Sequence, residues 1–249
     1  MSRTNLSDAE LHLYSRHILL DDWDLEAQQQ LKDKKVLIIG AGGLGCTSAE
    51  ILARTGVGSL YIIDFDTIET SNLQRQIAFK PQHVGQLKVQ VLAEHLREIN
   101  PHIHITSFSA TFDLKFSQTW QQHDFDLVLD GCDNFATRYY VNQYCLTHQI
   151  PLLSAAAIGF EGQLMFVQQQ PCYQCVFPQE EIEDTRRCSN SGVLTTTPMI
   201  MATLQAHHAL LYLGLNQTPL KNKLLLWNGK TMQQRVLNVV GDINCPCCL

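Results

Sequence analysis

Lys35-Val36-Leu37-Ile38-Ile39-Gly40-Ala41-Gly42-Gly43-Leu44-Gly45 is the stretch that decides the fold. Its first five residues form an apolar run with β-branched side chains, which is typical of a buried strand. The glycines that follow have the spacing Gly-x-Gly-x-x-Gly, and a helix rich in small and apolar residues is expected over 47–55. This strand–glycine–helix unit predicts a tight turn whose backbone amides and helix N-terminus face a phosphate group.

Strands and helices alternate along the chain after this unit. We expect strands at 59–63, 102–106, 126–130 and 152–156 and helices at 86–99, 114–121 and 134–148. Alternation of this kind predicts an α/β fold with a Rossmann-like, doubly wound, mainly parallel sheet. After residue 156 the pattern changes, and we interpret it as an antiparallel C-terminal extension with strands at 163–168, 223–227 and 235–240 and a helix at 197–213.

Composition and charge narrow the class of protein. The 249 residues are 45% hydrophobic and 17% charged, with a net charge of −6, which excludes a disordered chain. An acidic chain without a basic stripe argues against a protein that coats nucleic acid or an anionic membrane. Residues 1–10 lack the layout of a signal peptide, so a cytoplasmic protein is expected. The low charge fraction also favours an oligomer.

Acidic, amide and cationic side chains follow the second strand. Asp64 ends that strand, where a carboxylate can accept hydrogen bonds from ribose hydroxyls. The glycine motif and Asp64 leave NAD, FAD and ATP open as ligands. Arg75, in the segment 71–75, and Lys88 favour a triphosphate, because its cleavage needs cations that offset charge on the phosphate oxygens.

Asp133 follows the fourth strand at the carboxyl end of the sheet. Ligands of open α/β sheets bind at this edge, so Asp133 could hold Mg²⁺. The alternative is that Asp133 only caps the helix that begins near Asn134. Further along, Ile158-Gly159-Phe160 and Gly162-Gln163 are compatible either with a path for a thin peptide or with an ordinary β-turn and strand.

These motifs, from Tyr14-Ser15-Arg16-His17 to the last cysteines, resemble the MoeB/ThiF/HesA family of adenylyltransferases, bacterial relatives of the ubiquitin-activating enzymes. The resemblance implies an enzyme that binds ATP and Mg²⁺ and adenylates the C-terminal Gly-Gly carboxylate of a ubiquitin-like sulfur-carrier protein. It implies a homodimer, in which Arg16 reaches the partner subunit's site, and a possible sulfur donor protein. Residues 1–249 would form a single domain, with N-terminal helices in 1–32, a nucleotide-binding half in 33–156 and a carrier-binding and zinc half in 157–249.

Motifs and resemblance together give the expected site. The nucleotide-binding residues are Gly40, Gly42, Gly43, Gly45, Asp64, Asp66, Ser71, Asn72, Leu73, Gln74, Arg75, Lys88, Asp133 and Asn134. The catalytic residues are Arg16, Arg75, Lys88, Asp133 and Cys188. Cys188 follows Arg186-Arg187, and two adjacent cations favour a reactive thiolate. The resemblance implies that Cys188 joins the activated carrier or holds transferable sulfur; the alternative is an ordinary surface thiol.

Two Cys-x-x-Cys pairs, Cys172/Cys175 and Cys245/Cys248, supply the four thiolates of a structural zinc site. The two pairs are far apart along the chain, so their spacing alone only suggests a zinc site. The resemblance implies paired cysteines at both places and strengthens the zinc interpretation. Cys247 could replace one ligand, and a redox role for the C-terminal cysteines is an alternative. Such a site would pin the C-terminal tail to the body of the domain.

The motifs 172–178, 187–188 and 227–230 look more like ThiF than MoeB. We therefore expect the carrier of thiamine thiazole synthesis, with the molybdopterin-synthase carrier as the alternative. Outside this class, an NAD-dependent oxidoreductase would also use the glycine motif and Asp64, but Arg75 and Lys88 count against it.

Overall fold

The computed structural model describes residues 5–119, 124–178 and 192–248. The helices are α1 (Asp8–Leu13), α2 (Ser15–Ile18), α3 (Leu25–Lys32), α4 (Gly43–Thr55), α5 (Lys88–Ile99), α6 (Leu114–Thr119), α7 (Phe135–Thr147), α8 (Tyr173–Val176) and α10 (Thr196–Leu215). The strands are β1 (Lys35–Ile39), β2 (Ser59–Ile63), β3 (His104–Phe108), β4 (Leu127–Asp130), β5 (Leu152–Ile158), β6 (Glu161–Val167), β7 (Lys223–Asn228) and β8 (Gln233–Asn238). Two short 3-10 helices, η1 (Thr70–Asn72) and η2 (Pro81–His83), lie between β2 and α5.

The strands form one eight-stranded sheet in the order β3-β2-β1-β4-β5-β6-β7-β8. The pairs from β3 to β5 are parallel, and those from β5 to β8 are antiparallel. The expected doubly wound sheet with an antiparallel extension is therefore confirmed. The strand expected at 102–106 lies two residues later, because residues 101–103 form a turn before β3. The last strand, expected at 235–240, lies two residues earlier.

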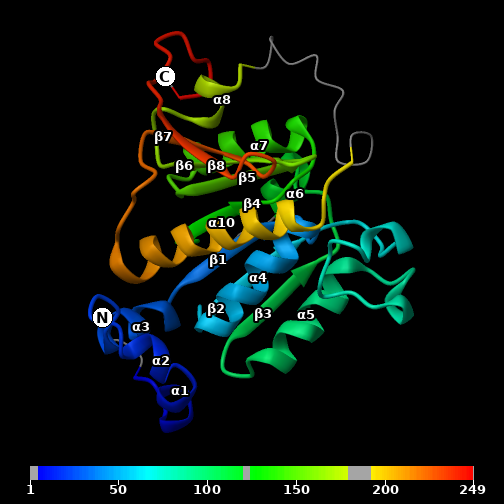
Figure 1. The fold of residues 1–249 in the computed structure, drawn as a ribbon, viewed down its shortest axis with the longest axis vertical. Helices are drawn as coiled ribbons and strands as arrows, with labels where there is room; N and C mark the ends of the chain where they lie inside the picture. The colour runs from blue at the N-terminus through cyan, green and yellow to red at the C-terminus, as the bar shows by residue number, and fades with distance from the viewer. Residues whose placement is uncertain (1–4, 120–123, 179–191, 249) are drawn as a thin grey trace.

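Helices cover both faces of the sheet, so the central strands are buried on both sides (Figure 1). One hydrophobic core joins the sheet to α3, α4, α5 and α10, and a second joins the opposite face to α7 and α8. This double cover explains why β1 and β4 read as continuous apolar runs rather than alternating ones. In the described ranges, no helix is long and apolar enough to cross a membrane.

The chain leaves β1 toward β2 on one side and returns to β4 on the other, which makes a topological switch point between β1 and β4. Ligands of open α/β sheets bind at the carboxyl ends of the strands at this point. Two tight turns meet there, because a Cβ added at Gly40 would lie 3.0 Å from the carbonyl oxygen of Gly131. Gly40 also has a φ of +96°, which favours glycine.

Helix α4 begins at Gly43, four residues before the helix expected from the sequence. Glycines have low helix propensity, so the first turn of this helix carries no local signal. Tertiary packing overrides that preference, since a Cβ at Gly45 would lie 1.8 Å from the carbonyl oxygen of Gly40. The third glycine of the motif is therefore needed for contact between the helix and the turn.

Candidate functional site

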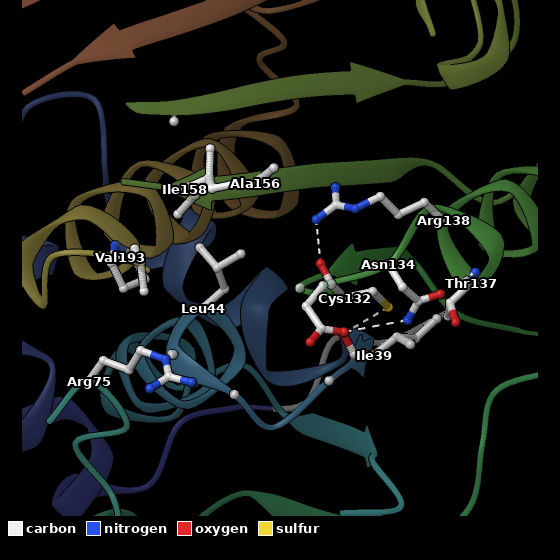
Figure 2. A pocket seen from close by; sticks show the side chains of 18 of the residues that line it. Ile39, Leu44, Arg75, Cys132, Asn134, Thr137, Arg138, Ala156, Ile158 and Val193 are labelled. Carbon is white, nitrogen blue, oxygen red and sulfur yellow. Dashed lines mark hydrogen bonds between the residues drawn. The ribbon is translucent and has the colours of Figure 1, made fainter. Parts of the chain in front are cut away.

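A pocket of about 1150 Å³ opens at the switch point. It extends from the glycine turn after β1 to the antiparallel strands β6, β7 and β8. Eleven of the expected nucleotide-binding residues line it: Gly40, Gly42, Gly43, Asp64, Asp66, Ser71, Asn72, Arg75, Lys88, Asp133 and Asn134. Figure 2 shows Arg75 on one side of the pocket and Arg138 on the other, with Cys132 near Arg138.

Asp64 fixes the glycine turn. One of its oxygens accepts a hydrogen bond from the backbone N–H of Ala41 at 2.7 Å, and the other accepts one from the N–H of Asp66 at 2.8 Å. Burial raises the pKa of the Asp64 carboxyl, and the Lys88 charge and the two amides only partly offset this effect. These two hydrogen bonds fix the conformation of the turn, and each carboxylate oxygen keeps a lone pair that can accept a hydrogen bond from a ligand hydroxyl.

Two cations lie on the β2 side of the pocket. The Lys88 ammonium is buried and forms an ion pair with Asp66 at 2.7 Å. Arg75 donates one hydrogen bond from its guanidinium to the carbonyl oxygen of Ser71 at 2.8 Å, which leaves other N–H groups for a ligand. The N–H groups of Arg75 and the backbone amides of the glycine turn are therefore the groups that can receive an anionic phosphate.

Asp133 is exposed in the pocket and is not the cap of α7. Asn134 has that role, since its side chain accepts a hydrogen bond from the N–H of Thr137 at 2.9 Å. The capping alternative for Asp133 is therefore wrong. Its carboxylate contacts only the Asn134 amide, at 3.5 Å, among the hydrogen bonds of the described residues. The arrangement leaves Asp133 free to bind a cation or a substrate.

Behind Asp133 lies a buried ion pair that the sequence did not reveal. The guanidinium of Arg138, on α7, is 3.2 Å from Asp130 at the end of β4. Arg138 also donates hydrogen bonds to the carbonyl oxygens of Cys132 and Ala155, while Asp130 accepts one from the N–H of Cys132 at 2.9 Å. Both side chains thus hold the backbone of Cys132, the residue before Asp133.

The charge state of this pair follows from its surroundings. Burial opposes the guanidinium charge, but Asp130, Tyr173 and Cys132 together outweigh this effect and raise the pKa of Arg138. Arg138 therefore stays protonated at every working pH. The only sequence signal was a carboxylate at the end of an apolar strand with an arginine eight residues later.

The other expected nucleotide and catalytic residues do not line the pocket. Gly45 packs beneath the turn, Leu73 packs against the core, and Gln74 accepts a hydrogen bond from the Thr195 hydroxyl at 2.7 Å. Arg16 is exposed on α2, away from the pocket of its own chain. Cys188 lies outside the described residues.

The β5–β6 hairpin forms part of the pocket wall. Ile158 pairs with Glu161, so Gly159 and Phe160 make a two-residue turn. Of the residues proposed for a peptide path, Ile158, Gly162 and Gln163 line the pocket, whereas the turn itself does not. The two readings of this segment are therefore compatible, because an ordinary hairpin supplies the wall.

The two cysteine pairs meet above α7. The sulfurs of Cys172, Cys175, Cys245 and Cys248 lie within 4.8 Å of one another. Four converging thiols fit the donor set of a tetrahedral zinc site. The Cys247 sulfur instead accepts a hydrogen bond from the buried Asn142 amide at 3.2 Å. The pairing chosen from the x-x spacing is thus the one that the structure brings together.

Tyr173, inside the first cysteine pair, is a pocket residue that sequence reasoning missed. It is only 1% exposed, and it lines the pocket together with Phe177. Burial raises the pKa of Tyr173 to about 12, so the hydroxyl keeps its proton at neutral pH. No signal distinguished it from a spacer between two metal ligands.

The chain is similar to known proteins over almost its whole length. The molybdopterin-synthase adenylyltransferase of Escherichia coli (strain K12) is 39% identical over 247 residues, which cover 98% of each chain. The sulfur carrier protein ThiS adenylyltransferase of the same strain is 40% identical over 246 residues, which cover 98% of this chain and 97% of that protein. A crystal structure of E. coli MccB with MccA-N7isoASN has a TM-score of 0.83 at 24% identity, covering 95% of this chain and 75% of MccB, which shows the same fold.

A family model described as the ThiF family matches residues 14–247. The match includes the glycine turn and the pocket residues on both sides of the switch point. It also includes three of the four clustered cysteines and ends one residue before the fourth, Cys248. The chain therefore belongs to the ThiF family.

Proposed function

We propose that this protein is an ATP-dependent adenylyltransferase that activates the C-terminal glycine carboxylate of a ubiquitin-like sulfur-carrier protein. The products would be the carrier acyl-adenylate and pyrophosphate. The observation that carries the proposal is the pocket itself, in which the glycine turn, Arg75, Lys88 and Asp133 converge at the switch point. The names of the two bacterial relatives supply the reaction class.

The chemistry needs alignment and charge neutralisation rather than a general base. A carboxylate at neutral pH is already ionised, so its oxygen attacks the α-phosphorus of ATP directly. A new O–P bond forms, the bond between the α-phosphorus and the bridging oxygen breaks, and pyrophosphate leaves with the electron pair. Arg75 and Lys88 would neutralise charge on the phosphates, and the turn amides would orient them.

Two metal ions belong to the proposal. The free carboxylate of Asp133 would help hold Mg²⁺, which offsets phosphate charge when bound. The cysteine cluster would hold a structural Zn²⁺. Zinc at this position would fix the C-terminal tail to α8 and to the body of the domain, as the sequence predicted.

The carrier is proposed from the sequence motifs. Their likeness to ThiF favours the carrier of thiamine thiazole synthesis, and the alternative is the molybdopterin-synthase carrier. The two relatives bear both names at nearly equal identity, so they support each carrier alike. Cys188 remains a predicted second catalytic group, which would receive the activated carrier or sulfur from a donor protein.

A homodimer would explain where Arg16 acts. Arg16 is exposed, and Leu13, Leu19, Leu20 and Leu25 around it are exposed as well, as expected of a surface that another subunit covers. Mixing Arg16→Ala and Asp133→Ala protomers should restore about a quarter of wild-type activity, because half of the dimers would carry one intact site. No recovery in verified heterodimers would contradict an arginine that acts across subunits.

The reaction is tested by incubating the protein with Mg²⁺, ATP and each purified carrier and measuring the intact mass of the carrier. The expected result is a gain of one AMP on a carrier that ends in Gly-Gly and none on a carrier without its last glycine. Asp133→Asn should slow the gain by about 100-fold, whereas Glu98→Gln, at an exposed carboxylate on α5 outside the pocket, should not. No adduct on either carrier would contradict the proposal.

A further inference from the structure

The pocket contains one buried hydroxyl group that the proposed reaction does not use. The Tyr173 oxygen is buried, and among the described residues it makes no hydrogen bond of normal geometry, although the Arg138 guanidinium lies close enough to act on it. Tyr173 is one of the residues that line the pocket. Buried polar groups are nearly always paired, and an unpaired one at a binding site is a candidate for pairing with the ligand.

The phenol ring is held firmly by its neighbours. It contacts Phe177 at a centroid distance of 4.7 Å and Tyr139, edge to face, at 6.0 Å. The backbone is fixed too, since the Tyr173 N–H donates to the Asn142 side-chain oxygen at 2.9 Å. The amide of the same Asn142 donates to Cys247, so one side chain ties both cysteine pairs to α7. The hydroxyl is thus pre-positioned, which lowers the entropic cost of a contact.

The polar groups next to Tyr173 already have hydrogen-bond or ion-pair partners in the protein. Arg138 acts on the Tyr173 oxygen, but a guanidinium is only a donor and cannot accept the phenol proton. The same guanidinium donates to Ser154 and to the carbonyl oxygens of Cys132 and Ala155, and it pairs with Asp130. None of these acceptors is a partner of the Tyr173 hydroxyl. The proton of the hydroxyl is therefore available to an oxygen atom that the ligand brings.

The position of Tyr173 favours a peptide over a nucleotide. The glycine turn, Arg75 and Lys88 lie on the β1–β2 side of the switch point. Tyr173 belongs to α8, which lies beside α7 on the other side, and Arg138 beside it bonds to β5 (Figure 1). The wall on that side continues into Gln163 on β6 and Trp227 on β7.

We propose that the Tyr173 hydroxyl donates a hydrogen bond to an acceptor oxygen at the C-terminus of the incoming peptide, either the carboxylate or the adjacent peptide carbonyl. Tyr173 is then a substrate-binding residue, and the cysteine cluster on either side of it serves the pocket as well as the tail. The inference depends on the proposed function, because it requires a peptide carboxylate as substrate.

The test measures the Kd of a Gly-Gly carrier by calorimetry, in the presence of a non-hydrolysable ATP analogue and Mg²⁺. Tyr173→Phe keeps the ring and removes only the oxygen. It should raise the carrier Kd about three- to tenfold, the value of one hydrogen bond, and leave the Kd of the ATP analogue unchanged. The melting temperature should change little, since the lost oxygen makes no hydrogen bond of normal geometry in the free protein.

Tyr139→Phe is the matched control from the same aromatic group. Its hydroxyl donates to the Phe177 carbonyl oxygen at 3.1 Å and does not line the pocket. Its removal should lower the melting temperature and leave the carrier Kd unchanged, which is the pattern of a structural hydroxyl.

Three outcomes would overturn the inference. An unchanged carrier Kd in Tyr173→Phe would exclude the contact, and a weaker Kd for the ATP analogue alone would assign the hydroxyl to the nucleotide. If the wild-type protein itself binds neither type of Gly-Gly carrier, the proposed function fails and the inference fails with it. The wild-type titration therefore separates the two failures.

Discussion

Replacing Arg138 with methionine is expected to lower the free energy of unfolding by about 3–5 kcal/mol, the cost of removing one partner from a buried ion pair. Asp130 is 1% exposed at its side chain and Arg138 is 6% exposed, so solvent does not screen the charge that remains. The carbonyl oxygens of Cys132 and Ala155 would each lose a donor as well. Methionine has similar length and leaves little cavity.

A double-mutant cycle separates the pair from the packing of its members. Asp130→Asn keeps the shape and an acceptor for the Cys132 N–H, but leaves the guanidinium without its counter-charge. The double variant should be more stable than the sum of the two single losses predicts, by about 1–3 kcal/mol. Arg97→Met is the matched control, because Arg97 is exposed and, among the described residues, donates one hydrogen bond, to the Ile105 carbonyl oxygen at 2.8 Å.

The assay is urea denaturation followed by circular dichroism at pH 7. The m-value, which is the slope of the unfolding free energy against urea concentration, is compared for each variant. The control should lose no more than about 1 kcal/mol. Because the pair also holds Cys132 next to Asp133, folded Arg138→Met protein should show slower adenylation as well. A loss below about 1 kcal/mol for Arg138→Met, or strict additivity in the cycle, would contradict a stabilising ion pair between Arg138 and Asp130.

Three further predictions concern other parts of the fold. Gly45→Ala should weaken ATP binding at least about tenfold in calorimetry, because its Cβ would meet the Gly40 carbonyl oxygen at 1.8 Å and displace the turn; wild-type affinity would contradict this. Burial opposes ionisation of Glu10, but Lys32 and Ser7 together outweigh burial and lower the pKa of the Glu10 carboxyl. The free energy of unfolding that Glu10 adds relative to Glu10→Gln should therefore be full at pH 7 and decrease as the pH falls below about 4.3. Urea denaturation at a series of pH values would measure it. A chelator should release one zinc ion per chain and lower the melting temperature, whereas a metal-free, equally stable protein would contradict the four-cysteine site.

Hydrophobic runs and turn residues in the sequence predicted most of the fold. The apolar runs that became β1 and β2 were predicted with their observed bounds, because each is a buried strand bounded by clear turn signals. The beginning of α4 was missed because glycines contribute no helical signal there. Contact between helix and turn, which needs glycine at residue 45, decides that start.

The candidate site was predictable where its residues follow the strands of the parallel sheet. The glycine turn, Asp64 and Asp133 follow strands directly, so sheet topology gathers them at one edge. Asp130, Arg138 and Tyr173 were missed because their roles depend on contacts between separate elements. Arg138 in a helix resembles any surface arginine until β4 and β5 are known to lie against it.

The cysteines are an intermediate case. Two pairs about 70 residues apart indicate four thiolates but not that they meet. The chain returns through β7 and β8, which extend the sheet beside β6, and the last two cysteines then join the first pair. The choice of Cys248 over Cys247 came from the x-x spacing, and the structure places the Cys247 sulfur on Asn142.

The most direct test of the account is exchange of labelled pyrophosphate into ATP in the presence of a Gly-Gly carrier. Reversible adenylation predicts exchange that requires the carrier and Mg²⁺, and preference between the thiamine-type and molybdopterin-type carriers would identify the pathway. Absence of exchange with both carriers, in protein that is folded and contains zinc, would contradict the assignment of this pocket to carboxylate adenylation.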